Sequence, residues 1–170
     1  MVIRKLHPED AAAFQALRLR GLLEIPSAFT SSHGEEVDIP LEETARRIAP
    51  KPDGVIFGAF VNGVLVGLLG VQREAQTQIS HKAFVWGMYV APEHRLHGLG
   101  RLLVAEALRF AKQDLGVLSV KLGVNAGNAA AIALYEAMGF RTYGTESGFL
   151  MIDGVLYDEQ LMSVVIQDST

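Results

Sequence analysis

Two short segments have residue types and spacings that could do chemistry. The first is Arg95-x-x-Gly98-x-Gly100, which lies between a predicted strand and a predicted helix. The first turn of a helix has backbone N–H groups without intrahelical partners and a partial positive charge. Glycines let a ligand come close to that backbone, and Arg95 and Arg101 add cationic charge. The segment therefore predicts a pyrophosphate site, although the glycines alone are equally compatible with a tight turn that binds nothing.

Other phosphate-binding motifs do not fit this segment. It has no Gly-Lys-Ser/Thr sequence, which excludes a P-loop. The spacing of a dinucleotide-binding fingerprint would need a third glycine at position 103, where the chain has Leu103. Four predicted strands also precede the segment, whereas a Rossmann domain begins with its nucleotide-binding strand-helix-strand unit.

The second segment is a predicted helix that carries Asn128 and Tyr135. Seven residues are nearly two helical turns, so both side chains lie on almost the same face, about 10 Å apart along the axis. Ala131 between them leaves room for a ligand along that face. Asn128 alone is better interpreted as a helix cap, and Tyr135 is open to a core role. A phenol beside a groove lined by alanines can also donate a proton to a thiolate leaving group.

Hydrophobic periodicity, glycines and prolines define the elements that must position these residues. Asn62-Gly63 between two apolar runs predicts a β-hairpin. A C-terminal cap is predicted at Gly116. The predicted helices span residues 8–23, 41–48, 98–112 and 128–138, and the predicted strands span residues 2–6, 55–61, 64–72, 83–90, 117–124, 141–145 and 156–166.

This order of elements predicts an α/β fold with a mixed sheet and helices on both faces. Its 170 residues fit a single domain, residues 1–170. The chain has no cysteine, which excludes disulfides, thiolate catalysis and zinc bound by cysteine. The formal net charge of −4 argues against nucleic acid as a main partner. No apolar run is long enough for a signal peptide or a membrane span, so we expect no membrane partner and a cytoplasmic protein.

Both segments resemble the GNAT superfamily of N-acetyltransferases. The matching residues are 90–100, VAPEHRLHGLG, and 128–140, NAAAIALYEAMGF. The predicted order of strands and helices agrees with that superfamily along nearly the whole chain. The resemblance implies a GNAT-like central sheet, mostly antiparallel, with one splayed parallel pair of strands.

The resemblance also implies acetyl-CoA as the cosubstrate, in a V-shaped cleft between the strands that end near Val90 and Val124. Backbone groups of Met88 and Val90 would hold the pantetheine arm, and the Met88 amide would stabilise the oxyanion. Asn128 would bind the pantetheine or phosphate region, and Tyr135 would protonate the departing CoA thiolate. The pyrophosphate would be bound by backbone amides of the segment 95–101, which includes Arg95, Leu96, Gly98, Gly100 and Arg101.

The chain departs from the resemblance at the general base. Many members of the superfamily have a glutamate on the fourth strand, where this chain has Phe84, and relatives that modify protein N-termini have one on the next strand, at the position of Gly123. Deprotonating a lysine amine at pH 7 costs roughly 4–5 kcal/mol, against roughly 1 kcal/mol for an α-amine. The missing carboxylate therefore favours an acceptor amine of low pKa or a water relay.

The remaining acid and base candidates are interpreted as solvated surface groups: His33, Glu36, Glu146 and Asp158. His81 is expected to be a surface histidine at a strand edge, and Trp86 is expected in the core. Loops often determine specificity. We therefore expect residues 24–37 and 145–158 to select the acceptor.

The sequence leaves three functions open. The first is an N-acetyltransferase that acts, without a metal, on a primary amine of a small molecule or a peptide N-terminus. The second is a non-catalytic domain that senses acyl-CoA, in keeping with the absent base, although such a sensor has no need of a proton donor at Tyr135. The third is a structural domain whose glycine turn binds nothing. The acceptor, a homodimer and the preference for acetyl over longer acyl groups are left open.

Overall fold

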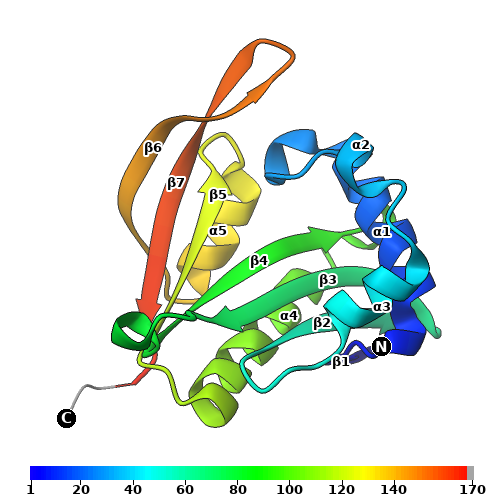
Figure 1. The fold of residues 1–170 in the computed structure, drawn as a ribbon. Coiled ribbons are helices and arrows are strands. Elements are labelled where there is room, and N and C mark those ends of the chain that lie inside the picture. Colours follow the sequence, from blue (N-terminus) through cyan, green and yellow to red (C-terminus); the bar gives the residue numbers. More distant parts are fainter. Residues whose placement is uncertain (168–170) are drawn as a thin grey trace.

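One seven-stranded mixed sheet organises the chain. The computed structural model describes residues 1–167, and its strands follow the order β1-β2-β3-β4-β5-β7-β6 (Figure 1). The strands are β1 Val2–Lys5, β2 Gly54–Val61, β3 Val64–Arg73, β4 Lys82–Val90, β5 Ser119–Asn125, β6 Arg141–Ile152 and β7 Val155–Val165. The α-helices are α1 Ala11–Glu24, α2 His33–Glu36, α3 Leu41–Ile48, α4 Leu99–Phe110 and α5 Ala129–Ala137.

Strands β4 and β5 form the one parallel pair among the strands described. They pair over three residues only, from Lys82 opposite Ser119 to Phe84 opposite Lys121, and then diverge (Figure 1). The other neighbouring strands are antiparallel. This confirms the predicted mixed sheet with one splayed parallel pair.

Helices cover both faces of the sheet. On one face, α4 inserts Leu103, Val104 and Ala107 into a core that also contains Tyr135 of α5. On the other face, α1 and α3 bury a second apolar cluster against Leu68 and Tyr89. The two faces of β4 and β5 therefore have different environments.

Besides shifts of one to three residues at other ends, the elements differ from the prediction in three places. Helix α4 ends at Phe110, because the chain continues as a π-helical turn from Ala111 to Leu115 before Gly116, at a φ of 66°, ends it as predicted. Strand β6 runs on to Ile152 instead of 145, because Asp153-Gly154 forms the turn that pairs it with β7. Residues 27–40, for which no element is predicted, contain the short helix α2.

Candidate functional site

Strand β4 has a bulge in its pairing with β3, and on its other side β5 leaves part of its edge free. Trp86 pairs with Gly70 and Tyr89 with Leu68, so two residues of β4 stand opposite one residue of β3. Gly87, in the bulge, has a φ of 67°, which glycine adopts without steric cost. Because β5 has already diverged, no strand within residues 1–167 pairs with the edge of β4 beyond Phe84 on that side. Its backbone groups are available to an extended ligand.

The turn before α4 presents unpaired amides. Leu96 and Gly98 have φ values of 64° and 81°, and the first helical hydrogen bond joins the Leu102 N–H to the Gly98 carbonyl. The amides of residues 99–101 precede that bond, and no side chain of residues 1–167 caps the helix. These N–H groups, together with the positive end of the helix dipole, form an anion-binding arrangement.

The two glycines of this turn have different structural roles. A Cβ on Gly98 would meet nothing within 4 Å, so that position requires glycine for its backbone conformation. A Cβ on Gly100 would lie 3.0 Å from Met88 Cε and 3.1 Å from Leu134 Cδ2. Gly100 therefore provides space between α4, β4 and α5.

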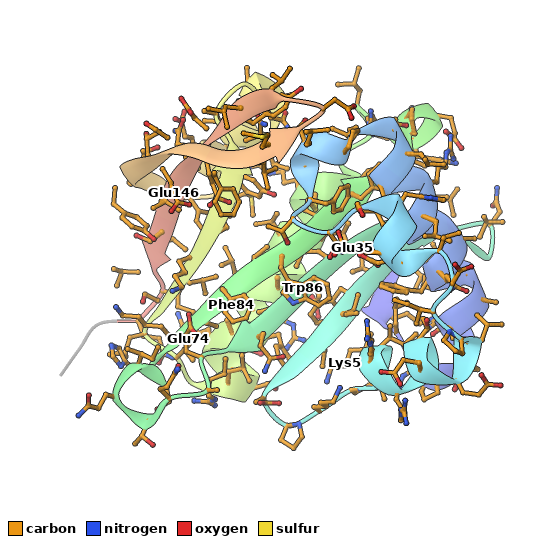
Figure 2. The ribbon with its side chains drawn as sticks, turned by 45° about the horizontal axis from the view of Figure 1, so that its top comes forward. Lys5, Glu35, Glu74, Phe84, Trp86 and Glu146 are labelled. Carbon is orange, nitrogen blue, oxygen red and sulfur yellow. The ribbon has the colours of Figure 1, made fainter. Side chains whose placement is uncertain are left out.

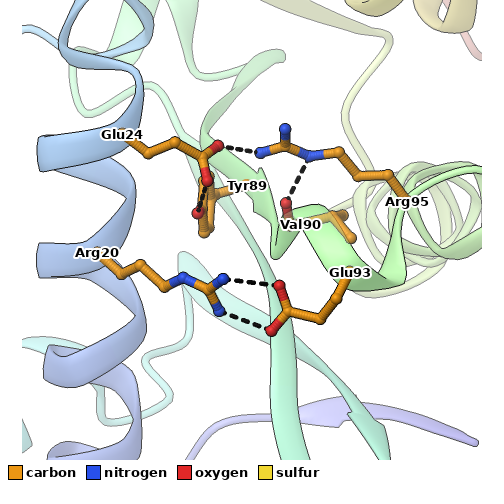
Figure 3. A network of polar contacts seen from close by, with 6 residues as sticks. All are labelled: Arg20, Glu24, Tyr89, Val90, Glu93 and Arg95. Carbon is orange, nitrogen blue, oxygen red and sulfur yellow. Dashed lines mark hydrogen bonds and ion pairs between the residues drawn. The ribbon is translucent and has the colours of Figure 1, made fainter.

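Arg95 is held by an ion pair with Glu24 at the end of α1. Its guanidinium donates to Glu24 at 2.5 Å and to the Val90 carbonyl at 2.9 Å, and Glu24 also accepts from the Tyr89 hydroxyl (Figure 3). The Arg95 amide donates to Pro92 O at 3.2 Å. The prediction that this amide is free for a ligand is therefore wrong, because the turn of residues 92–95 uses it. Glu24 also offsets the charge of the guanidinium.

A second ion pair reinforces the same contact between α1 and the turn. Arg20 binds both carboxylate oxygens of Glu93, at 2.8 and 2.6 Å (Figure 3). Hydrogen bonding by Arg20 lowers the pKa of Glu93 to about 2. Burial, followed by the hydrogen bond to Glu24, raises the pKa of the Tyr89 phenol. The ion pairs Arg20–Glu93 and Glu24–Arg95 both connect the end of α1 to the segment that leads into α4.

One cleft of about 1080 Å³ brings most of the predicted cofactor residues together. The edge of β4, the turn before α4 and one face of α5 line it. The predicted residues that line the cleft are Met88, Val90, Arg95, Leu96, Gly98, Gly100, Arg101 and Asn128. Residues from three segments far apart in the sequence therefore form one continuous wall.

Asn128 is the N-terminal cap of α5. Its side chain accepts a hydrogen bond from the Ala131 N–H at 3.1 Å, as the interpretation as a cap predicts. The side-chain NH₂ group makes no recorded hydrogen bond to residues 1–167. Asn128 can therefore cap the helix and still donate to a ligand in the cleft.

Tyr135 does not line the cleft, although the preceding residue, Leu134, does. Its ring is buried and packs edge-on against Phe140, with the centroids 5.8 Å apart. Burial raises the pKa of Tyr135 to about 12. Within residues 1–167 its hydroxyl has no hydrogen-bond partner. Every fully buried side-chain polar atom in this part of the chain has one, so the hydroxyl oxygen is not fully buried. The hydroxyl therefore has some access to solvent, and its role as an acid stays a prediction.

A smaller pocket, of about 290 Å³, lies on the far side of β5. Ala28 lines both this pocket and the cleft, and Asn125 of β5 donates to the Ser27 carbonyl at 3.4 Å. The remaining lining residues come from 27–30, β5 and the β6–β7 hairpin. Both segments predicted to select the acceptor contribute to this pocket.

Glu159 of β7 is the residue in this pocket that the sequence interpretation missed. A Cβ on Gly123 would lie 2.0 Å from Glu159 Oε1, so the carboxylate occupies the space of a side chain at position 123. Burial, followed by the charge of Glu146, raises the pKa of Glu159. The available signal was a glycine on β5 that lies diagonally from a glutamate on β7, and recognising it requires the register of the two strands.

Two of the four acid and base candidates named from the sequence are engaged elsewhere. Arg18 binds both oxygens of Glu36 at 3.1 and 2.9 Å, and Asp158 Oδ1 accepts from the Gly148 amide at 2.8 Å. His33 starts the short helix α2. Glu146 is exposed on β6, which agrees with a surface group (Figure 2).

Phe84 and Trp86 of β4 lie on the face of the sheet away from α4 (Figure 2). The core position predicted for Trp86 is wrong: the side chain is 37% exposed and covers Gly70, whose absent Cβ makes room for the indole. Phe84 is half-buried, and His81 is exposed as predicted. Within residues 1–167 we find no group of three residues suited to hold a metal ion.

Comparison with known proteins identifies the family. The acetyltransferase (GNAT) family matches residues 20–140, and this chain belongs to that family. A mycothiol acetyltransferase of Segniliparus rotundus is 29% identical over 133 residues, which are 76% of this chain and 50% of the relative. N-alpha-acetyltransferase RimI of Mycobacterium tuberculosis is 33% identical over 104 residues, 61% of this chain and 62% of the relative. The chain thus matches less than two thirds of the length of either relative.

Solved structures show the same fold. A GNAT-family acetyltransferase from Streptococcus pneumoniae superimposes with a TM-score of 0.87 at 25% identity, over 98% of this chain and 99% of that one. A Salmonella typhimurium structure with its cofactor acetyl-CoA gives a TM-score of 0.82 at 22% identity, over 100% and 96% of the two chains. No helix within residues 1–167 is long and apolar enough to cross a membrane.

Proposed function

We propose that this chain is an N-acetyltransferase that moves the acetyl group of acetyl-CoA to a primary amine by direct attack. The observation that carries the proposal is the cleft, in which the unpaired edge of β4, the uncapped start of α4 and the Asn128 face of α5 meet. An extended polar arm ending in a pyrophosphate matches these three surfaces. The proposal includes a single domain, residues 1–170. It also includes a cytoplasmic location.

The family supports acetyl-CoA as the cosubstrate, and so does the acetyl-CoA in the Salmonella typhimurium structure. In the proposed complex the pyrophosphate accepts hydrogen bonds from the amides of residues 96–101, and Arg101 adds positive charge. The pantetheine arm lies along Met88 and Val90 as an added strand would. Asn128 donates its free NH₂ group to the same arm.

Two groups act on the reacting thioester. As a neutral amine attacks the carbonyl carbon, negative charge develops on the oxygen, and the Met88 amide in the bulge of β4 stabilises it. One preorganised donor of this kind is worth about 3–4 kcal/mol. Tyr135, whose phenol is protonated at neutral pH, then supplies a proton to the CoA thiolate.

The experiment that tests the proposal is release of free thiol from acetyl-CoA in the presence of a panel of amines. An alanyl tetrapeptide, spermidine, phenethylamine and Nα-acetyl-lysine cover peptide N-termini, polyamines, apolar amines and lysine side chains. We expect release that depends on at least one amine. Calorimetric binding of acetyl-CoA without amine-dependent release would favour the acyl-CoA sensor instead, and no binding would favour a structural turn.

A further inference from the structure

Glu159 places a carboxylate where β5 itself has none. Its Oε1 lies 2.0 Å from the position that a Cβ on Gly123 would take, with Oε2 at 3.0 Å. Glu159 pairs with Asn125 in the register of β5 and β7, so its side chain reaches diagonally over Gly123. The absence of a side chain at position 123 is what makes room for this carboxylate.

The carboxylate faces the pocket beside the cleft rather than the core. Val120, Leu122 and Val124 of β5 are buried in the core formed with α4 and α5. The alternate residues Gly123 and Asn125 belong to the opposite face of the strand, and both line the pocket with Glu159. Ala28 lines this pocket and the cleft, so the two spaces border the same residue.

The charged groups beside Glu159 in its pocket are other carboxylates. Glu146 stands opposite it on β6, and Asp158 lines the same pocket while it accepts from the Gly148 amide. On β5, Lys121 is paired with Glu74 at 2.8 Å. Within residues 1–167 no ion pair or hydrogen bond of the Glu159 side chain is recorded. The half-buried carboxylate is therefore available to a cation from outside.

We propose that Glu159 binds the acceptor amine as an ammonium ion and acts as the general base that deprotonates it. The inference rests on the proposed N-acetyltransferase function. Burial and the charge of Glu146 raise the pKa of Glu159, which makes its carboxylate a stronger base than an ordinary glutamate. The carboxylate that strand β5 lacks is thus supplied by β7.

An ammonium N–H proton passes to a Glu159 oxygen, and Glu159 later releases it to solvent. The neutral nitrogen attacks the thioester carbonyl carbon, forming the C–N bond and a negatively charged oxygen. Collapse of this adduct breaks the C–S bond, and the second proton lost by nitrogen replaces the proton that Tyr135 gives to the thiolate. The products are the amide, CoA with a free thiol, and one proton.

The first experiment compares Glu159→Gln with Glu146→Gln, using the amine from the panel that gives the fastest release. General-base catalysis contributes typically about 10²–10⁴-fold, so we expect Glu159→Gln to lose at least about a hundredfold in kcat/KM. The acidic limb of its pH profile should disappear, while calorimetric affinity for acetyl-CoA stays unchanged. Glu146→Gln removes the same charge from the opposing strand. It should keep most of the rate and move the acidic limb to lower pH, because a negative neighbour of Glu159 is gone.

The second experiment moves the carboxylate from β7 to β5. Glu159→Ala should be slow, and Glu159→Ala combined with Gly123→Glu should recover at least tenfold, because the new side chain starts in the space that the old carboxylate filled. Gly123→Ala alone keeps the glutamate but displaces its carboxylate, and should also be slow.

The outcomes separate this inference from the proposed function. If the parent protein releases thiol with an amine and Glu159→Gln does so at the same rate with an intact acidic limb, Glu159 is not the base and the acetyltransferase proposal stands. If the parent binds acetyl-CoA and releases no thiol with any amine, both proposals are overturned.

Discussion

Gly98 and Gly100 stand two residues apart, and replacing each by alanine should have a different consequence. Gly98→Ala forces a Cβ into a left-handed backbone, which costs roughly 1–2 kcal/mol, so it should lower the free energy of unfolding. Gly100→Ala places a Cβ 3.0 Å from Met88 Cε. The flexible methionine end can shift, so stability should change little while affinity for acetyl-CoA falls. Denaturant unfolding and calorimetry measure the two effects, and a large loss of stability in Gly100→Ala would contradict the assignment.

Tyr135→Phe should separate catalysis from binding. The ring keeps its contact with Phe140, and the hydroxyl makes no recorded hydrogen bond, so stability and acetyl-CoA affinity should stay close to the parent. Turnover should fall about a hundredfold if the phenol is the acid. Because burial raises the pKa of Tyr135 to about 12, the parent should show no alkaline limb from this group below about pH 11. A variant as fast as the parent would remove Tyr135 from the mechanism.

At the scale of residues, motif spacing predicted the walls of the cleft but missed the carboxylate in the neighbouring pocket. Residues 95–101 are local to one turn, so their spacing alone indicates what they can bind. Glu159 gains its place only through its register with Asn125, and no local pattern contains that pairing. The same reason explains Trp86: an indole in an apolar strand suggests the core, whereas Gly70 on the neighbouring strand lets it lie on the surface.

At the scale of elements, α1 is attached to the turn before α4 by two ion pairs, Glu24 with Arg95 and Arg20 with Glu93. Glu24 also holds negative charge beside the anion-binding turn. Such partly exposed pairs contribute roughly 0–1 kcal/mol to stability. Their larger effect is therefore expected on binding of an anionic ligand.

Glu24→Gln should tighten binding of acetyl-CoA a few-fold, because it frees the Arg95 guanidinium and removes a negative charge near the pyrophosphate. The gain should shrink as salt increases from about 0.05 to 0.5 M, since screening shortens the range of these charges. Glu106→Gln is the matched control: it removes the same charge from α4 but frees Arg109, which does not line the cleft. Weaker binding in Glu24→Gln would mean that the attachment to α1 matters more than the charge.

Elements with strong periodicity were predictable, and irregular ones were not. Asn62-Gly63 forms the hairpin turn with φ values of 50° and 78°, as the dipeptide indicates. The bulge at Gly87 depends on how β4 pairs with β3, and the sequence shows only a glycine within an apolar strand. Strand β6 is exposed along most of its length, so it lacks the alternation that would have predicted its full extent.

At the scale of the whole molecule, three residue pairs between β4 and β5 join the two parts of the sheet. The ion pair between Lys121 and Glu74 adds a link near the closed end of the splay. Beyond Phe84 the two strands separate, and the edge of β4 faces the cleft. A ligand that lies along this edge therefore contacts both β4 and the face of α5 that lines the cleft.

This arrangement predicts how acetyl-CoA changes stability and amide exchange. At a concentration 100 times Kd, binding adds about 2.7 kcal/mol, which corresponds to a rise in Tm of roughly 5–10 °C for a chain of this size. Hydrogen exchange should slow in the turn of residues 96–101 and along β4 from Val85 to Val90. Adenosine 3′,5′-bisphosphate, which lacks the pyrophosphate link and the pantetheine arm, should leave exchange along that edge of β4 unchanged at equal saturation. Equal protection of β4 by both ligands would show that the arm does not lie along the strand.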